Sequence, residues 1–326
     1  MSLGSSNSRC ILKTEVARTA GVKRGISGVL LLDKPQGISS NRALQIAKHF
    51  FSARKAGHTG TLDPMATGLL PICFGDATRF SSALLGANKT YEATLRLGYT
   101  SSTGDAEGDI SVAKSVSDQN LNDVGSQVEM VLRSFTGLIT QMPPMYSALK
   151  HRGKPMYVYA REGVEIERQP RQVIIHELHL MAMEGDEIRL EVHCGSGTYI
   201  RTLAEDIGKA LGVGGAYLTA LRRTAIDDFD LSQADTLNNL ETMSMPERDS
   251  RLLTVDTLLQ GLTAVVLEAP TAAALRQGRS VEGAGAAVEG EKIRLYDEKR
   301  NFLGLGEVTA GGAIAPKKIL ASGPRL

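Results

Sequence analysis

A single aspartate, Asp63, stands in a segment whose composition suits covalent chemistry. Glycines bound the segment at Gly60 and Gly68, and they let a backbone or a ligand approach closely. A carboxylate presented in this way can act as a nucleophile or as a base. The alternative is structural, because Asp63 precedes Pro64 and an Asp–Pro pair commonly caps the start of a helix.

An ionised carboxylate in a buried site needs a cation, and Arg201 is a candidate for that cation. Arg201 follows the apolar Ile200 near the start of an expected helix. A positive charge in the first helical turn opposes the helix macrodipole, at a cost of about 0.3 kcal/mol or more. A partner such as Asp63 would offset this cost. The alternative is an arginine that lies along the surface with its head group in the solvent.

Other residues with chemical potential are less distinctive. Tyr91 and Tyr199 stand among apolar residues, where a tyrosine is ordinarily part of the core. Asp105, Glu107 and Asp109 alternate with small residues and are interpreted as a solvated turn. No metal site is indicated, because the residues that come closest to a ligand set lack the spacing of a known motif; they are His176, His179, His193 and Cys194.

Hydrophobic patterns predict the elements that position these residues. Residues 28–33 form a continuous apolar run typical of a buried strand, and Ser39 or Ser40 can cap a helix after it. Residues 91–98 alternate as a half-buried strand does, whereas 57–68 are predicted to form a loop. Further predictions are helices over 120–134, 198–211 and 272–277, a hairpin of 173–180 with 188–193, and strands over 293–296, 302–308 and 314–320.

Length and composition indicate a two-domain protein of 326 residues with a net charge of +1. No apolar run is long enough to span a membrane, and the scattered cysteines favour a reducing compartment, so a cytoplasmic location is expected. Basic residues gather in 1–28 and in 150–154, where they could contact phosphates or form an ordinary solvated surface. The predicted domains are a basic, disordered arm over 1–24, a catalytic domain over 25–250 and a small β module over 251–326.

Five motifs in register resemble those of the TruB-type tRNA pseudouridine synthases. The resemblance runs from about residue 25 to residue 230, and the tail after residue 250 is similar to the small PUA module of bacterial members. The motifs are Gly28-Val-Leu-Leu-Leu-Asp-Lys-Pro-Gln-Gly-Ile-Ser-Ser40, Ala56-Gly-His-Thr-Gly-Thr-Leu-Asp-Pro-Met-Ala-Thr-Gly-Leu-Leu-Pro71, Lys89-Thr-Tyr91, Gly197-Thr-Tyr-Ile-Arg-Thr202 and Leu221-Arg-Arg-Thr224.

The resemblance implies an α/β (α+β) pseudouridine-synthase domain on a mixed, largely antiparallel sheet, followed by a small C-terminal PUA-like β-barrel module. It implies an isomerase that converts uridine to pseudouridine at position 55 in the T-loop of tRNA, acting on a flipped-out base. Asp63 would be the nucleophile, Arg201 its ionic partner, and Tyr91 a stacking residue that takes part in proton removal. The substrate-binding residues would be His58, Tyr91, Tyr199, Leu221, Lys34 and Pro35.

The resemblance also has implications for partners. tRNA would be recognised through its T-arm and T-loop by a monomer that requires no metal, organic cofactor, membrane or obligatory protein partner. Two other hypotheses stay open at this point. One is an RNA chaperone that folds tRNA without catalysis, an activity that could coexist with synthase activity. The other is a synthase of this fold that partner molecules guide to another RNA.

Overall fold

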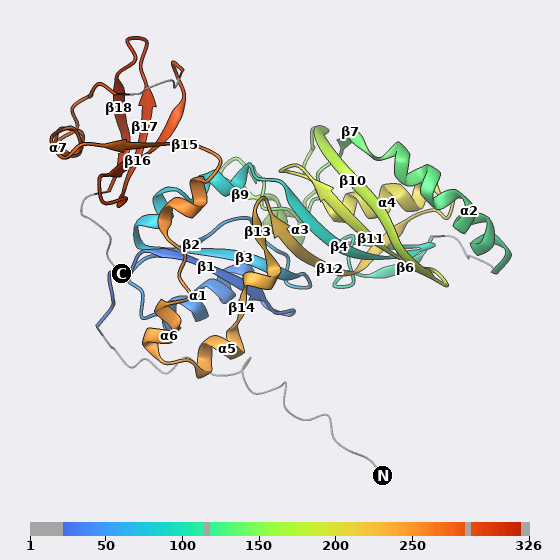
Figure 1. Cartoon of the computed structure of the whole chain (residues 1–326). Coiled ribbons are helices and arrows are strands. Elements are labelled where there is room, and N and C mark those ends of the chain that lie inside the picture. Colours follow the sequence, from blue (N-terminus) through green and yellow to red (C-terminus); the bar gives the residue numbers. More distant parts are fainter. Residues whose placement is uncertain (1–21, 114–117, 284–287, 321–326) are drawn as a thin grey trace.

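The computed structural model describes residues 22–113, 118–283 and 288–320. Its centre is a ten-stranded sheet in the order β14-β1-β3-β12-β4-β11-β10-β7, with β2 paired to β3 and β13 to β12 (Figure 1). Within the described strands of this ten-stranded sheet, only the β1–β14 and β3–β12 pairs are parallel, so the expected mixed, largely antiparallel sheet is confirmed. The strands are β1 (Gly28–Lys34), β2 (Ala56–His58), β3 (Thr67–Phe74), β4 (Lys89–Leu97), β7 (Gly137–Gln141), β10 (Arg171–Glu184), β11 (Glu187–Cys194), β12 (Ala216–Ile226), β13 (Phe229–Asp230) and β14 (Asp235–Thr236).

The helices lie beside this sheet and in the C-terminal module. α2 and α4 lie at one end of the sheet, and α1, α5 and α6 lie at the other (Figure 1). Two short hairpins, β5 with β6 and β8 with β9, complete the part of the chain around the ten-stranded sheet, which we call the main body. The bounds are α1 (Ser40–Phe50), α2 (Asp118–Ser134), α3 (Met156–Arg161), α4 (Ile200–Ala210), α5 (Leu237–Thr242), α6 (Met245–Asp249), α7 (Ala269–Arg276), β5 (Tyr99–Ser101), β6 (Ile110–Val112), β8 (Lys150–His151) and β9 (Lys154–Pro155).

Burial explains why the two best-patterned strands differ in sequence. The continuous apolar run of β1 is buried on both faces: Leu30 and Leu32 join the core shared with the helices, and Val29 and Leu31 join a second core on the opposite face. β4 instead alternates, because its Ala93, Leu95 and Leu97 face the helix side while the residues between them are half-buried. Alternation of buried and half-buried residues is the pattern of a strand whose sheet has one more solvent-exposed face.

The predicted helix after β1 is confirmed, with Ser39 as its cap: the Ser39 side chain accepts a hydrogen bond from the backbone of Arg42. The predicted helix over 198–211 is observed as α4, and the predicted hairpin is observed as β10 and β11. The loop predicted over 57–68 is shorter than expected, since β2 reaches His58 and β3 begins at Thr67.

The C-terminal module is a four-stranded sheet with α7 beside it (Figure 1). Phe302 of this module packs edge-to-face on Phe80 of the main body, with ring centroids 5.6 Å apart. Arg79 Nη1 donates to the carbonyl of Ile319 at 2.8 Å, and Lys318 Nζ donates back to the carbonyl of Arg79 at 2.8 Å. The strands are β15 (Thr263–Leu267), β16 (Lys292–Asp297), β17 (Phe302–Val308) and β18 (Ile314–Ile319).

Most of the expected basic arm, residues 1–21, lies outside the described residues. Its last residue, Arg24, contacts the main body. The Arg24 guanidinium donates two hydrogen bonds to the Asp249 carboxylate, and its backbone nitrogen donates to the carbonyl of Ser52 at 2.7 Å.

Candidate active site

Asp63 lies in the short connection between β2 and β3. No helix begins at Pro64; residues 64–65 form a bend, and β3 starts two residues later. The backbone nitrogen of Ala66 donates to the carbonyl of Asp63 at 3.1 Å, which closes a turn. The interpretation of Asp63 as a helix cap is therefore wrong, and its carboxylate is free to make other contacts.

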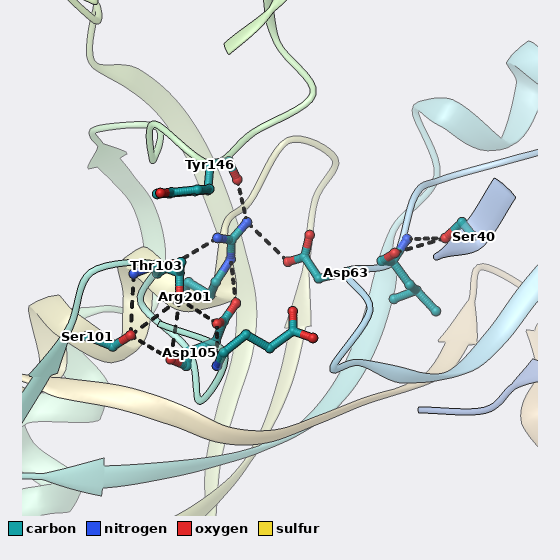
Figure 2. A network of polar contacts seen from close by, with 9 residues as sticks. Ser40, Asp63, Ser101, Thr103, Asp105, Tyr146 and Arg201 are labelled. Carbon is teal, nitrogen blue, oxygen red and sulfur yellow. Dashed lines mark hydrogen bonds and ion pairs between the residues drawn. The ribbon is translucent and has the colours of Figure 1, made fainter. Parts of the chain in front are cut away.

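The last residue of β1, Lys34, and the first residue of α1, Ser40, support the connection that carries Asp63. Ser40 Oγ donates to the carbonyl of Leu62 at 2.9 Å and accepts from its backbone nitrogen at 2.8 Å (Figure 2). Lys34 is fully buried, and its Nζ donates to the carbonyls of Pro35 and Ile38 at 2.9 and 2.8 Å. Burial lowers the pKa of Lys34 to about 8, against the opposing attraction of Asp63.

Arg201 provides the cation. Its side chain is 7% exposed, so the surface interpretation of this arginine is wrong. Nη2 lies 3.1 Å from Asp63 Oδ2 and donates to the carbonyl of Tyr146 at 2.7 Å, while Nη1 donates to the carbonyl of Thr103 at 2.9 Å (Figure 2). Three polar groups from three segments of the chain therefore fix one guanidinium.

Asp105 is the second carboxylate beside Arg201, and it corrects the sequence interpretation. It was expected in a solvated turn, yet it is only 3% exposed, and its Oδ2 lies 3.8 Å from Arg201 Nε. Asp105 Oδ1 accepts from Thr103 Oγ1 at 2.6 Å and from the backbone nitrogen of Glu107 at 3.1 Å. The turn folds inward because Arg201, far away in the sequence, pairs with it.

The charges around Asp63 act in opposite directions on its protonation. Burial raises the pKa of Asp63 above its ordinary value, and the nearby Asp105 adds to this effect. The positive charges of Arg201 and Lys34 lower the pKa. The two cations therefore offset part of the rise in the Asp63 pKa that burial causes.

A cavity of about 190 Å³ opens beside this ion pair. Of the predicted site residues, it brings together Asp63, Tyr91, Tyr199, Arg201 and Leu221. Burial raises the pKa values of both tyrosines, so both phenols are protonated in the resting site. An apolar wall with a carboxylate and two phenol rings suits a flat, polar heterocycle.

Three predicted residues do not line the cavity. Lys34 lies beneath the Asp63 connection, and Pro35 is exposed beside it. His58 ends β2 and is half-buried, and its Nδ1 has no hydrogen-bond partner within the described part of the chain. Burial and the charge of Arg223 lower the pKa of His58, so a neutral imidazole is favoured.

Arg223 is a buried residue of the site that the sequence did not single out. It lies on β12, two residues after Leu221, and is 1% exposed. Its Nε donates to the carbonyl of Leu69 at 2.7 Å and its Nη2 to the carbonyl of Gly60 at 2.9 Å. The only local signal was an arginine pair within the motif Leu221-Arg-Arg-Thr224.

Comparison with known proteins settles the family. The family description "TruB family pseudouridylate synthase (N terminal domain)" matches residues 48–200, and two TruB C-terminal descriptions match 201–266 and 263–320. A protein of Nitrosospira multiformis named tRNA pseudouridine synthase B is 62% identical over 304 residues, which cover 92% of this chain and 97% of that protein. This chain belongs to the TruB family of pseudouridylate synthases. It is therefore an enzyme, an isomerase, as the motifs predicted.

Other relatives of this TruB-family chain extend the comparison. A Nitrosomonas europaea protein of the same name is 52% identical over 89% of this chain and 95% of its own length. A solved chain from a Cbf5–Nop10–Gar1 complex superposes with a TM-score of 0.66 and 28% identity, over 90% of this chain and 84% of that one. Within the described residues of the TruB-family chain, no cluster of three or more His, Cys, Asp or Glu could hold a metal ion, and no helix could cross a membrane.

Proposed function

We propose that this enzyme isomerises uridine 55 in the T-loop of tRNA, with Asp63 as the nucleophile. The observation that carries the proposal is the 3.1 Å ion pair between Asp63 and Arg201 at the wall of a cavity that also contains Tyr91. The named relatives act on tRNA, which supports tRNA as the substrate class here.

The chemistry requires an ionised carboxylate beside an extruded base. Pseudouridine forms when the N1–C1′ bond breaks, the uracil turns, and C5 joins C1′. Attack by Asp63 on C6 of the ring or on C1′ of the ribose gives a covalent intermediate, and both routes need the same ion pair with Arg201. The carboxylate lies at the cavity, so the reacting atoms meet only after the base enters it.

Entry of the base requires base flipping. Extruding a stacked nucleotide costs a few kcal/mol, and stacking on an aromatic ring returns about 1–3 kcal/mol per base. Tyr91 and Tyr199 line the cavity and supply such rings. Leu221 adds an apolar side chain to the cavity wall. His58, at the end of β2 and just before the Asp63 connection, would take the place of the extruded base in the RNA loop.

The surface beside the cavity suits the T-arm backbone. Lys150 and Arg152 are exposed on the β8–β9 hairpin, close in sequence to Ser147 and Ala148 of the cavity wall. Phosphate contacts from such residues supply sequence-independent affinity. We place the catalytic domain over 25–250 and an RNA-contacting module over 251–326, in an enzyme that acts as a monomer without an obligatory protein partner.

The test uses a tRNA transcript tritiated at C5 of uridine. Wild type should release tritium, Asp63→Asn should release none while it still binds the transcript, and the exposed control Asp109→Asn should match wild type. A transcript with cytidine at position 55 should also give no release. Binding without release by the wild type would exclude this synthase activity and leave tRNA folding as the function.

A further inference from the structure

Arg223 is a buried cation that the proposed reaction does not use. It is among the largest fully buried side chains of the protein, and among the described residues no carboxylate forms an ion pair with it. An arginine buried without a carboxylate is costly unless its N–H groups find other acceptors. Such residues concentrate where a charge has a functional task.

The acceptors of Arg223 bracket the segment that carries Asp63. Its guanidinium donates hydrogen bonds to the carbonyls of Gly60 and Leu69, on either side of that aspartate. Gly68 lies directly beside Arg223 in the parallel pairing of β3 with β12. The Arg223 side chain therefore fixes the backbone at both ends of the connection that carries Asp63, and we call this contact the clamp.

The glycines that bound the segment are explained by this arrangement. A Cβ at Gly60 would lie 3.3 Å from Arg223 Nη1, and a Cβ at Gly68 would lie 2.2 Å from the Arg223 carbonyl oxygen. Both glycines also have positive φ angles, of 72° and 100°. The guanidinium and its strand occupy the space that side chains would otherwise need.

Tyr91 is the second group that Arg223 contacts. The two residues are directly opposite in the antiparallel β4–β12 pair, so their side chains project from the same face. Burial raises the pKa of Tyr91, and the charge of Arg223 and a hydrogen bond to it partly oppose that rise. The other titratable groups around this phenol are Cys194 on β11, Asp63, and Tyr199 and Arg201 across the cavity.

We propose that Arg223 is a positioning residue with two tasks: it clamps the Asp63 segment at both ends, and its positive charge favours loss of the Tyr91 phenol proton to solvent, which forms the phenolate that then accepts the C5 proton. The inference rests on the proposed function. In that step the C5–H bond breaks, the proton passes to the phenolate oxygen, and the electron pair restores the C5–C6 double bond. The displaced electrons return to N1 or to the departing Asp63 carboxylate.

The test measures single-turnover tritium release across pH 6 to 10 for wild type, Arg223→Gln and Arg223→Lys. Arg223→Gln should lose about 10- to 100-fold at neutral pH, with unchanged tRNA affinity, and should recover rate as rising pH ionises Tyr91. Arg223→Lys keeps the charge but cannot reach both carbonyls, so it should show the wild-type profile at a lower plateau. The control is Arg222→Gln, which removes the adjacent, part-exposed arginine paired with Asp33.

The outcomes separate the two proposals. No release by the wild type would overturn the proposed function and this inference with it. Release by the wild type, with Arg223→Gln equally slowed at every pH or not slowed at all, would overturn this inference alone. If Arg223→Gln does not fold, Arg223→Lys decides, because an unchanged rate or a shifted pH profile in that variant contradicts the two tasks.

Discussion

Replacing Arg201 with lysine tests the geometry of the ion pair. The substitution keeps the positive charge but removes the forked guanidinium, which donates from more than one nitrogen. The guanidinium serves Asp63, Tyr146 and Thr103 from two different nitrogens. A lysine Nζ is a single point and cannot reach all three acceptors. At least one buried acceptor then loses a charged donor, which costs about 1.5–3 kcal/mol. If this loss falls on the orientation of Asp63, the single-turnover rate drops roughly 10- to 150-fold, at about 1.4 kcal/mol per tenfold.

The assay is tritium release at saturating enzyme over tRNA in a single turnover. The dissociation constant for tRNA is measured separately by filter binding. Affinity should be unchanged, because Arg201 is buried and its partners are protein groups. Arg222→Lys is the matched control, since its guanidinium also pairs with a carboxylate but is part-exposed. An Arg201→Lys variant within twofold of wild type would refute the argument that the fork, rather than the charge, positions Asp63.

Two further predictions concern stability. Burial lowers the pKa of Lys34 to about 8 from 10.5, so between these values the unfolded chain binds more protons than the native state. The unfolding free energy of wild type should therefore rise relative to Lys34→Met as pH increases from 8 to 10.5, by roughly 3 kcal/mol; a constant difference in denaturant titrations would contradict the shift. Gly68→Ala places a Cβ 2.2 Å from a backbone oxygen, whereas Gly37→Ala, also at positive φ, meets nothing within 4 Å. Thermal unfolding should show a loss of about 3 kcal/mol or more for Gly68→Ala and of about 1–2 kcal/mol for Gly37→Ala, and equal losses would show that sterics do not matter there.

Elements with a regular pattern and local signals could be predicted from the sequence. β1, α1, β4 and the β10–β11 hairpin were all anticipated, because their apolar periodicity or their caps are encoded by neighbouring residues. β3 was missed because Gly68 and Pro71 interrupt it, and both residues ordinarily mark loops. β12 was missed because two register shifts against β4, after Leu218 and after Arg223, break its alternation.

The site shows the same division between local and distant causes. The motifs identified Asp63, Tyr91, Tyr199, Arg201 and Leu221, which the structure gathers around one cavity. Asp105 and Arg223 were not identified as buried site residues, because the partners that bury them are far away in the sequence. A charged residue within a polar stretch looks like surface until its distant partner is known.

The position of β12 in the sheet means that a late segment of the chain completes the centre of the sheet. β12 lies between β3 and β4, although it follows both of them by more than a hundred residues in the chain. The β3 side carries Asp63 and the β4 side carries Tyr91, and residues 216–226 pair with both of these strands. We expect a nascent chain that ends before this strand to hold the ion-pair partners Asp63 and Arg201 but to lack the strand that lies between β3 and β4. We therefore expect activity only after most of the chain has been made.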